Sequence, residues 1–224
     1  MFVRQNQQQF RTANADVQIF YGDGSAPSAT NNNRTWNKPP GVSHVYIMCI
    51  GGGGPGNGAN SGGSGAVTVW YGAAQNVPDS LLVRMTAPGG GGAATVIAYR
   101  NGSGNPTNLI VANGSSSNLA GGATAANAFA ASGFYQSIAG QDGASGFQSA
   151  STTTFLSGGS GGGGSTLTTN YGYVIPSPSG GFFMLQPIIV GAGGNDSGNG
   201  GIGCGGGVTA GTKGGQGMVL IASW

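Results

Sequence analysis

The sequence contains no glutamate and very few charges of either sign. Only 5% of its 224 residues are charged, and all five acidic residues are aspartates. The seven basic residues are scattered, with no basic patch of the kind that neutralises phosphates. This composition excludes nucleic-acid binding through charge. It also weakens repulsion between molecules, which suits a protein that works within an assembly.

Cysteines and long apolar runs are also scarce. The two cysteines, Cys49 and Cys204, do not make a disulfide framework, and we expect both thiols to be free. No apolar run approaches the ~18 residues of a membrane span. The N-terminus has no apolar segment of the signal-peptide kind. We therefore expect folding in a cytoplasm and no membrane partner.

Candidate catalytic and metal-binding groups are equally sparse. His44 is the single histidine, and it falls on the opposite face of one predicted strand from Cys49. The sequence has no C-x-x-C pair and no G-x-S-x-G turn after a strand. Nothing in it pairs two carboxylates for glycoside cleavage. We therefore predict no catalytic residue, no metal site, no cofactor and no enzymatic activity.

Glycine, in contrast, is abundant, with 49 residues. Glycine allows close approach of backbones, but ordering it costs entropy. Two interpretations of its tracts are open: mobile loops, or extended three-residue-per-turn chains that stack because no side chain separates them. We expect ordered packing. The tracts are 51–65, 88–93, 157–165, 191–207 and 211–217.

The first tract contains a G-x-G-x-x-G pattern at Gly51, Gly53 and Gly56, directly after an apolar run. This pattern binds dinucleotides when a helix follows, because the helix N-terminal amides face the pyrophosphate. Here the residues from 55 to 61 are among the poorest helix formers. We interpret the match as a consequence of the glycine content.

Short β-type runs, each ended by glycine, proline or asparagine, alternate with the tracts. About eight such runs predict an all-β, jelly-roll-like sandwich with long ordered glycine-rich loops. We expect the last run to pair back with the early ones, which makes 17–224 a single domain. The alanine-rich segment 120–132 could hold one or two helical turns. The predicted strands are 17–21, 42–50, 66–71, 81–86, 94–99, 108–112, 182–190 and 217–223.

Two groups of residues are candidates for partner contacts. Residues 1–16 are polar with isolated apolar anchors, and they are either a frayed tail or an arm that orders on a neighbouring subunit or shell. Aromatic rings among small polar residues suit protein interfaces or carbohydrate stacking, although core packing is their commoner role. The candidates are Phe2, Val3, Arg4, Phe10 and Arg11 in the arm, and Trp70, Tyr71, Phe134, Tyr135, Tyr171 and Tyr173 in the domain.

Two stretches of the chain carry a resemblance to a known family. The first runs from Thr35-Trp36 through Pro40-Gly41-Val42 to the strand that ends in Ile50 and four glycines. The second is the closing segment 214–221, with Trp224 at the end. Together they resemble the glycine-rich domain of tailed-bacteriophage virion proteins, especially tail fibres. The resemblance covers 17–224, with 120–180 matching poorly and read as an insertion that carries partner contacts.

The resemblance implies a structural protein of a phage particle, located in the virion after assembly in the host cytoplasm. It implies a homotrimer that binds other virion proteins, either as a capsid decoration (cement) protein or as a fibre or spike subunit. The arm 1–16 would dock onto the shell or tail. Because so few residues precede the matching part, a compact accessory protein is favoured. The alternative is a receptor-binding adhesin that recognises a host surface glycan.

Overall fold

The structure is a computed structural model that describes residues 16–22, 33–89, 95–100, 106–115, 120–124, 132–143, 194 and 197–224. For 95–100, 106 and 107 it describes the backbone alone. Within these ranges the chain forms two antiparallel sheets, and its one helical element is a 3-10 turn. The predicted all-β class is confirmed. The jelly-roll connectivity stays a prediction.

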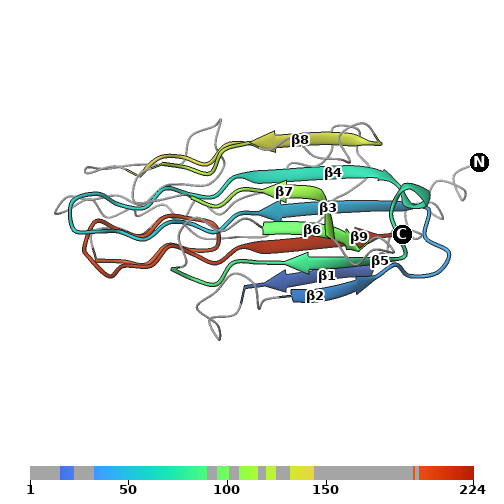
Figure 1. The fold of residues 1–224 in the computed structure, drawn as a ribbon, viewed down its shortest axis with the longest axis horizontal. Coiled ribbons are helices and arrows are strands. Elements are labelled where there is room, and N and C mark those ends of the chain that lie inside the picture. Colours follow the sequence, from blue (N-terminus) through green and yellow to red (C-terminus); the bar gives the residue numbers. More distant parts are fainter. Residues whose placement is uncertain are drawn as a thin grey trace, which may run out of the picture.

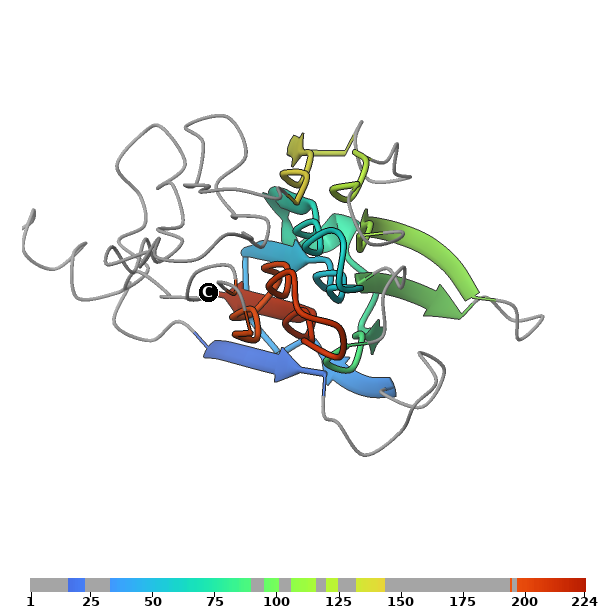
Figure 2. The ribbon, with the colours of Figure 1, turned by 90° about the vertical axis from the view of Figure 1, so that its left-hand side faces the viewer.

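The two sheets hold nine strands in the described part of the chain. The strands run along the long axis of the molecule (Figures 1 and 2). The 3-10 turn η2 (Ala74–Asn76) lies between β4 and β5. The five-stranded sheet has the order β1 (Asp16–Tyr21), β9 (Met218–Ser223), β3 (His44–Ile50), β4 (Val67–Ala73) and β8 (Phe134–Ile138). The four-stranded sheet has the order β2 (Asn33–Asn37), β5 (Ser80–Arg84), β6 (Thr95–Arg100) and β7 (Pro106–Ala112).

Seven of the predicted strands coincide with β1, β3, β4, β5, β6, β7 and β9. The last run does pair back as expected, since β9 lies between β1 and β3. The run 182–190 lies outside the described residues. Of the alanine-rich segment, 120–124 is not helical and 125–131 is outside the described part. Two strands were not predicted: β2, and β8, which lies inside the expected insertion 120–180 and pairs with β4.

The main core lies between the two sheets. One face of β3 contributes Val45, Ile47 and Cys49, all fully buried. Trp36 and Leu81 from the four-stranded sheet pack into the same cluster and are also fully buried. Because this cluster draws on both sheets, burial of its apolar area is what holds the sandwich together.

The outer face of the five-stranded sheet is apolar as well. Tyr46, Met48 and Ile50 point to this side of β3 and belong to a second buried cluster. Cys204, from the last glycine-rich tract, packs in the same cluster, with Ile202 partly buried against it. The division of β3 into two faces was predicted from its sequence, but burial on both faces was not.

The glycine tracts continue the strands toward the end of the molecule away from Trp224, and they wind as coiled traces at the left of Figure 1. They hydrogen-bond to one another through the backbone. Gly54, for example, donates to the carbonyl of Gly63 (2.9 Å) and accepts from the amide of Gly206 (2.9 Å). Its neighbour Gly53 donates to Gly215 (2.9 Å). Successive residues thus bond to different neighbouring segments of the chain. The segments therefore form a bundle, because in a sheet each strand bonds to neighbours on two sides only. We call it the glycine bundle.

Hydrogen bonds in the glycine bundle recur every third residue. This step is that of extended chains with three residues per turn, which pack closely where glycine removes the side chain. The order of all the tracts stays a prediction, because 157–165 lies outside the described residues. The bonds that show the step are Gly53 to Gly215 with Gly56 to Thr212, Gly62 to Gly206 with Gly65 to Gly203, and Gly200 to Lys213 with Gly203 to Gln216.

Candidate functional site

The predicted partner-contact residues fall into three groups in the structure. Trp70 is fully buried in the core between the sheets, so its ring packs inside the domain and this prediction is corrected. Tyr71, Phe134 and Tyr135 lie on the neighbouring strands β4 and β8, with Tyr71 opposite Phe134. The remaining candidates lie outside the described residues: Phe2, Val3, Arg4, Phe10, Arg11, Tyr171 and Tyr173.

Aromatic rings gather on the outer face of the five-stranded sheet. His44, Tyr71 and Trp224 are half-buried and nearly parallel, and their ring centroids form a triangle with sides of 5.7 to 5.8 Å. Phe134 lies opposite Tyr71 on the neighbouring strand β8 and is 51% exposed. We call these four residues the aromatic row. Parallel rings at this spacing attract one another and present a broad apolar surface.

The aromatic row is held by the strand ends beneath it. His44 and Trp224 exchange backbone hydrogen bonds of 3.1 and 3.2 Å, which places their side chains next to each other on one face. The Ser43 hydroxyl lies 3.0 Å from Nδ1 of His44 and donates to the carbonyl of Trp224. The aromatic row was not predicted, because His44 and Trp224 are far apart in the chain.

A second apolar row lies on β1, at the edge of the same sheet. Val17, Ile19 and Tyr21 point to the outer face and are 44%, 38% and 43% exposed. The other face of β1 turns Phe20 toward the main core. Proteins that stay monomeric usually protect an edge strand from pairing with another chain by a lysine, a proline or a bulge. Strand β1 has none of these three. We call these three residues the edge row.

The G-x-G-x-x-G segment enters the glycine bundle. Gly51, Gly53 and Gly56 donate their amides to carbonyl groups of Ala66, Gly215 and Thr212. These amides therefore have backbone partners, where a dinucleotide loop would direct its amides at a pyrophosphate. The segment continues as extended chain, as its sequence predicted.

The two cysteines lie in different clusters, and both are free thiols. Cys49 packs between the sheets and Cys204 on the outer face. Burial raises the pKa of the Cys49 thiol well above its usual value. The thiol stays protonated at neutral pH, so it is a packing group and not a nucleophile.

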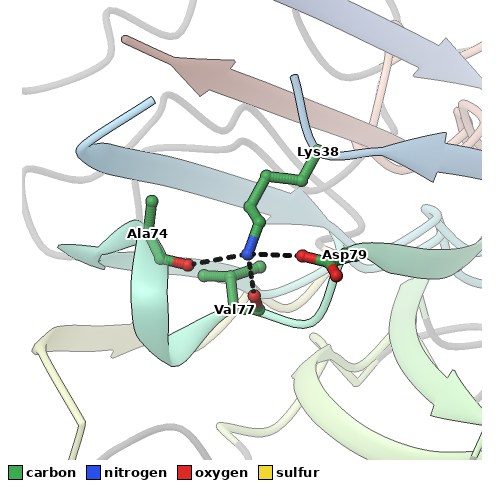
Figure 3. Close-up of polar contacts among 4 residues, drawn as sticks. All are labelled: Lys38, Ala74, Val77 and Asp79. Atoms are coloured by element: carbon green, nitrogen blue, oxygen red, sulfur yellow. Dashed lines mark hydrogen bonds and ion pairs between the residues drawn. The ribbon is translucent and has the colours of Figure 1, made fainter. Parts of the chain in front are cut away.

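Lys38 ties the end of β2 to the loop after η2 (Figure 3). Its Nζ donates to the carbonyls of Val77 (2.8 Å) and Ala74 (3.2 Å) and lies 2.8 Å from Oδ1 of Asp79. The Lys38 side chain is 18% exposed, whereas Asp79 is 94% exposed. All three N–H groups of the ammonium thus have acceptors, and two of these acceptors are backbone atoms.

Replacing Lys38 by methionine is expected to lower the free energy of unfolding by about 1–3 kcal/mol, because the carbonyls of Ala74 and Val77 lose the ammonium as a donor and Ala74 keeps only the amide of Val77. The matched control, Asp79→Asn, should leave stability nearly unchanged, since an exposed ion pair contributes little. Urea denaturation followed by tryptophan fluorescence measures both. Equal losses in the two variants would show that the ion pair, and not the backbone contacts, carries the energy.

Among the described residues, no group of three or more His, Cys, Asp or Glu side chains is placed to hold a metal ion. That same part of the chain has no helix with the length and apolar character needed to cross a membrane. The surface features of the described chain are therefore the aromatic row, the edge row and the region around Lys38.

Comparison with known proteins adds no assignment. No protein-family model matches the chain, and no curated protein matches it either. The class that the fold defines is an all-β sandwich extended by a glycine bundle.

Proposed function

We propose that this chain is a non-enzymatic structural protein of a tailed-phage particle that acts by binding other proteins of the particle. It would serve as a capsid decoration (cement) protein or as a fibre or spike subunit, in contact with a major capsid or tail protein. It would assemble in the host cytoplasm and reside in the virion. The resemblance of the segments 35–54 and 214–224 to phage glycine-rich domains is the starting point.

The observation that carries this proposal is the exposed apolar surface of a nearly uncharged chain. The edge row and Phe134 leave large apolar side chains in solvent on one sheet, while only 5% of the residues are charged. Exposed apolar groups gathered on one face mark interaction surfaces. With so few charges, binding through this face depends on apolar burial and depends weakly on salt.

Self-association into a homotrimer is part of the proposal. The glycine bundle makes its hydrogen bonds within one chain, so recovering the ordering cost of glycine does not itself require other subunits. Support for self-association therefore comes from the edge row, whose strand is the outermost of its sheet among the described strands and carries no charge between its residues 17 and 21.

Light scattering of the purified full chain at micromolar concentration is expected to give about three times the chain mass of 21.8 kDa. The double variant Ile19→Asp/Tyr21→Asp should shift the mass to that of one chain, because it buries two charges in the interface. Asn37→Asp, an exposed position on β2, is the control and should stay trimeric. A wild-type mass near 21.8 kDa would refute the trimer.

Immunogold electron microscopy tests the virion role. It uses an antibody against this chain on purified particles of the phage that encodes it. Label along the capsid lattice or on the tail is expected. Particles that carry no label would contradict the proposal. Deletion of 1–16 should reduce incorporation into particles if this segment is the docking arm, and normal incorporation would refute the arm.

The second candidate, a glycan-binding adhesin, is favoured by the aromatic row. Half-exposed parallel rings among small polar residues can stack against the apolar faces of sugars. Label confined to fibre tips, together with saturable binding of the purified chain to host cells, would support this candidate. Label on the capsid lattice would exclude it.

A further inference from the structure

A hollow of about 970 Å³ opens at the edge of the four-stranded sheet. Its walls come from β2, from the loop 75–79 and from the start of β5. This volume lies at the upper end of the range of ~300–1,000 Å³ found for small-molecule sites. The hollow is separate from both apolar rows, which lie on the other sheet.

The loop wall of the hollow is fixed before any ligand arrives. The ammonium of Lys38 binds the carbonyls of Ala74 and Val77 and the carboxylate of Asp79, as Figure 3 shows. The Lys38 amide also donates to the Asp79 carbonyl (2.8 Å). The Asn76 side-chain amide donates to the carbonyl of Ser132 (3.0 Å), which anchors the start of the loop to the segment before β8. A preformed wall lowers the entropy lost when a ligand binds.

The charges that line the hollow cancel. Among the described lining residues, Lys38 is the one cation and Asp79 the one anion, and they pair with each other. Because the donors of Lys38 are all engaged, this described lining offers no free cation to a phosphate or carboxylate ligand. Phosphorylated and anionic ligands are therefore disfavoured.

The remaining lining combines uncharged hydrogen-bonding groups with small apolar surfaces. Thr35, Gln75 and Ser80 make no side-chain hydrogen bond to other described residues, so their donors and acceptors are open to a ligand. Pro78 and Leu82 supply apolar surface beside them. Hydroxyl and amide groups next to apolar patches match a ligand that carries hydroxyls around a C–H face.

We infer that this hollow binds a neutral oligosaccharide. The free oxygen of the Asp79 carboxylate and the Gln75 amide bind sugar hydroxyls, and Thr35 and Ser80 add donors and acceptors. The apolar faces of the sugar rest on Pro78 and Leu82. This site stands apart from the proposed structural role, because it uses no residue of the aromatic row or the edge row.

The test is an NMR titration of the isotope-labelled full chain with four neutral probes: lactose, maltotriose, mannotriose and tri-N-acetylchitotriose. At least one is expected to cause saturable shifts of backbone amides in the region 75–82. Sialyllactose is the matched charged probe for lactose, and it should not bind better than lactose. Absence of saturable shifts with all four neutral probes would overturn the inference.

Variants then locate the binding site. Gln75→Ala combined with Thr35→Ala should weaken binding of the active probe at least about tenfold, a loss of ~1.4 kcal/mol. Phe134→Ala should leave it unchanged, and matching amide spectra of the free variants verify folding. Loss of binding in Phe134→Ala alone would place the sugar on the aromatic row and overturn the inference. A trimer that labels particles yet binds no sugar would leave the structural role standing.

Discussion

Replacing Gly53 by alanine is expected to lower the free energy of unfolding by about 3–5 kcal/mol, because the glycine bundle has no room for a methyl group. A Cβ at this position would overlap the carbonyl of Cys204 in the neighbouring tract. The obstacle is backbone, which cannot turn aside as a flexible side chain would. The two tracts must separate, and the hydrogen bonds from Gly53 to Gly215 and from Gly215 to Cys204 weaken together.

The control for this prediction is Gly211→Ala in a turn of the same bundle. A Cβ at Gly211 meets nothing within 4 Å, but its φ of 88° is unfavourable for alanine. The expected cost is therefore about 1–2 kcal/mol, from backbone strain alone. Urea denaturation of both variants measures the difference. A Gly53→Ala variant no less stable than Gly211→Ala would show that the tracts do not pack as described.

Replacing Trp70 by alanine is expected to cost about 3–5 kcal/mol, because the residue is fully buried and its removal leaves a large cavity. The Trp70 ring lies against Gly72 on its own strand, where a Cβ would overlap it. The neighbouring glycine therefore leaves the space that the ring fills, and Gly72 has no side chain to occupy that space when the ring is removed.

Tyr71→Ala is the matched variant one position along the strand. Tyr71 is half-buried on the outer face, so its truncation should cost clearly less than that of Trp70. Thermal and urea unfolding of the two variants test the assignment of the faces of β4. Light scattering first verifies that both variants keep the oligomeric mass of the wild type. Equal losses, or a larger loss at Tyr71, would show that the face assignment is wrong.

The sequence was most informative where strands follow a local pattern. Alternation in the run 42–50 predicted that Val45, Ile47 and Cys49 oppose Tyr46, Met48 and Ile50, and both clusters bear this out. The pattern failed for β2, in which Trp36 alone is buried among polar neighbours. It failed for β8 too, which was assigned to an insertion because its surroundings matched the family poorly.

The candidate sites were harder to predict, because they join distant parts of the chain. Trp70 and Tyr71 were both predicted as contact residues, yet adjacent residues in a strand point to opposite faces, and only one of them reaches the surface. The aromatic row combines β3, β4, β8 and the residue after β9. The hollow combines β2 with the loop 75–79. The Lys38 contacts and the pairing of β2 with β5 bring these two segments together.

Strand positions and their inward and outward faces follow from alternation, which is encoded in neighbouring side chains and so can be read from the chain alone. The glycine tracts encode no such information, since a glycine has no side chain to specify which neighbour it meets or in which register. Their partners are decided by the folded sandwich, whose strand ends place 51–65 beside 200–217. The surfaces offered to partners are decided in the same way, because exposure depends on which strands become edges.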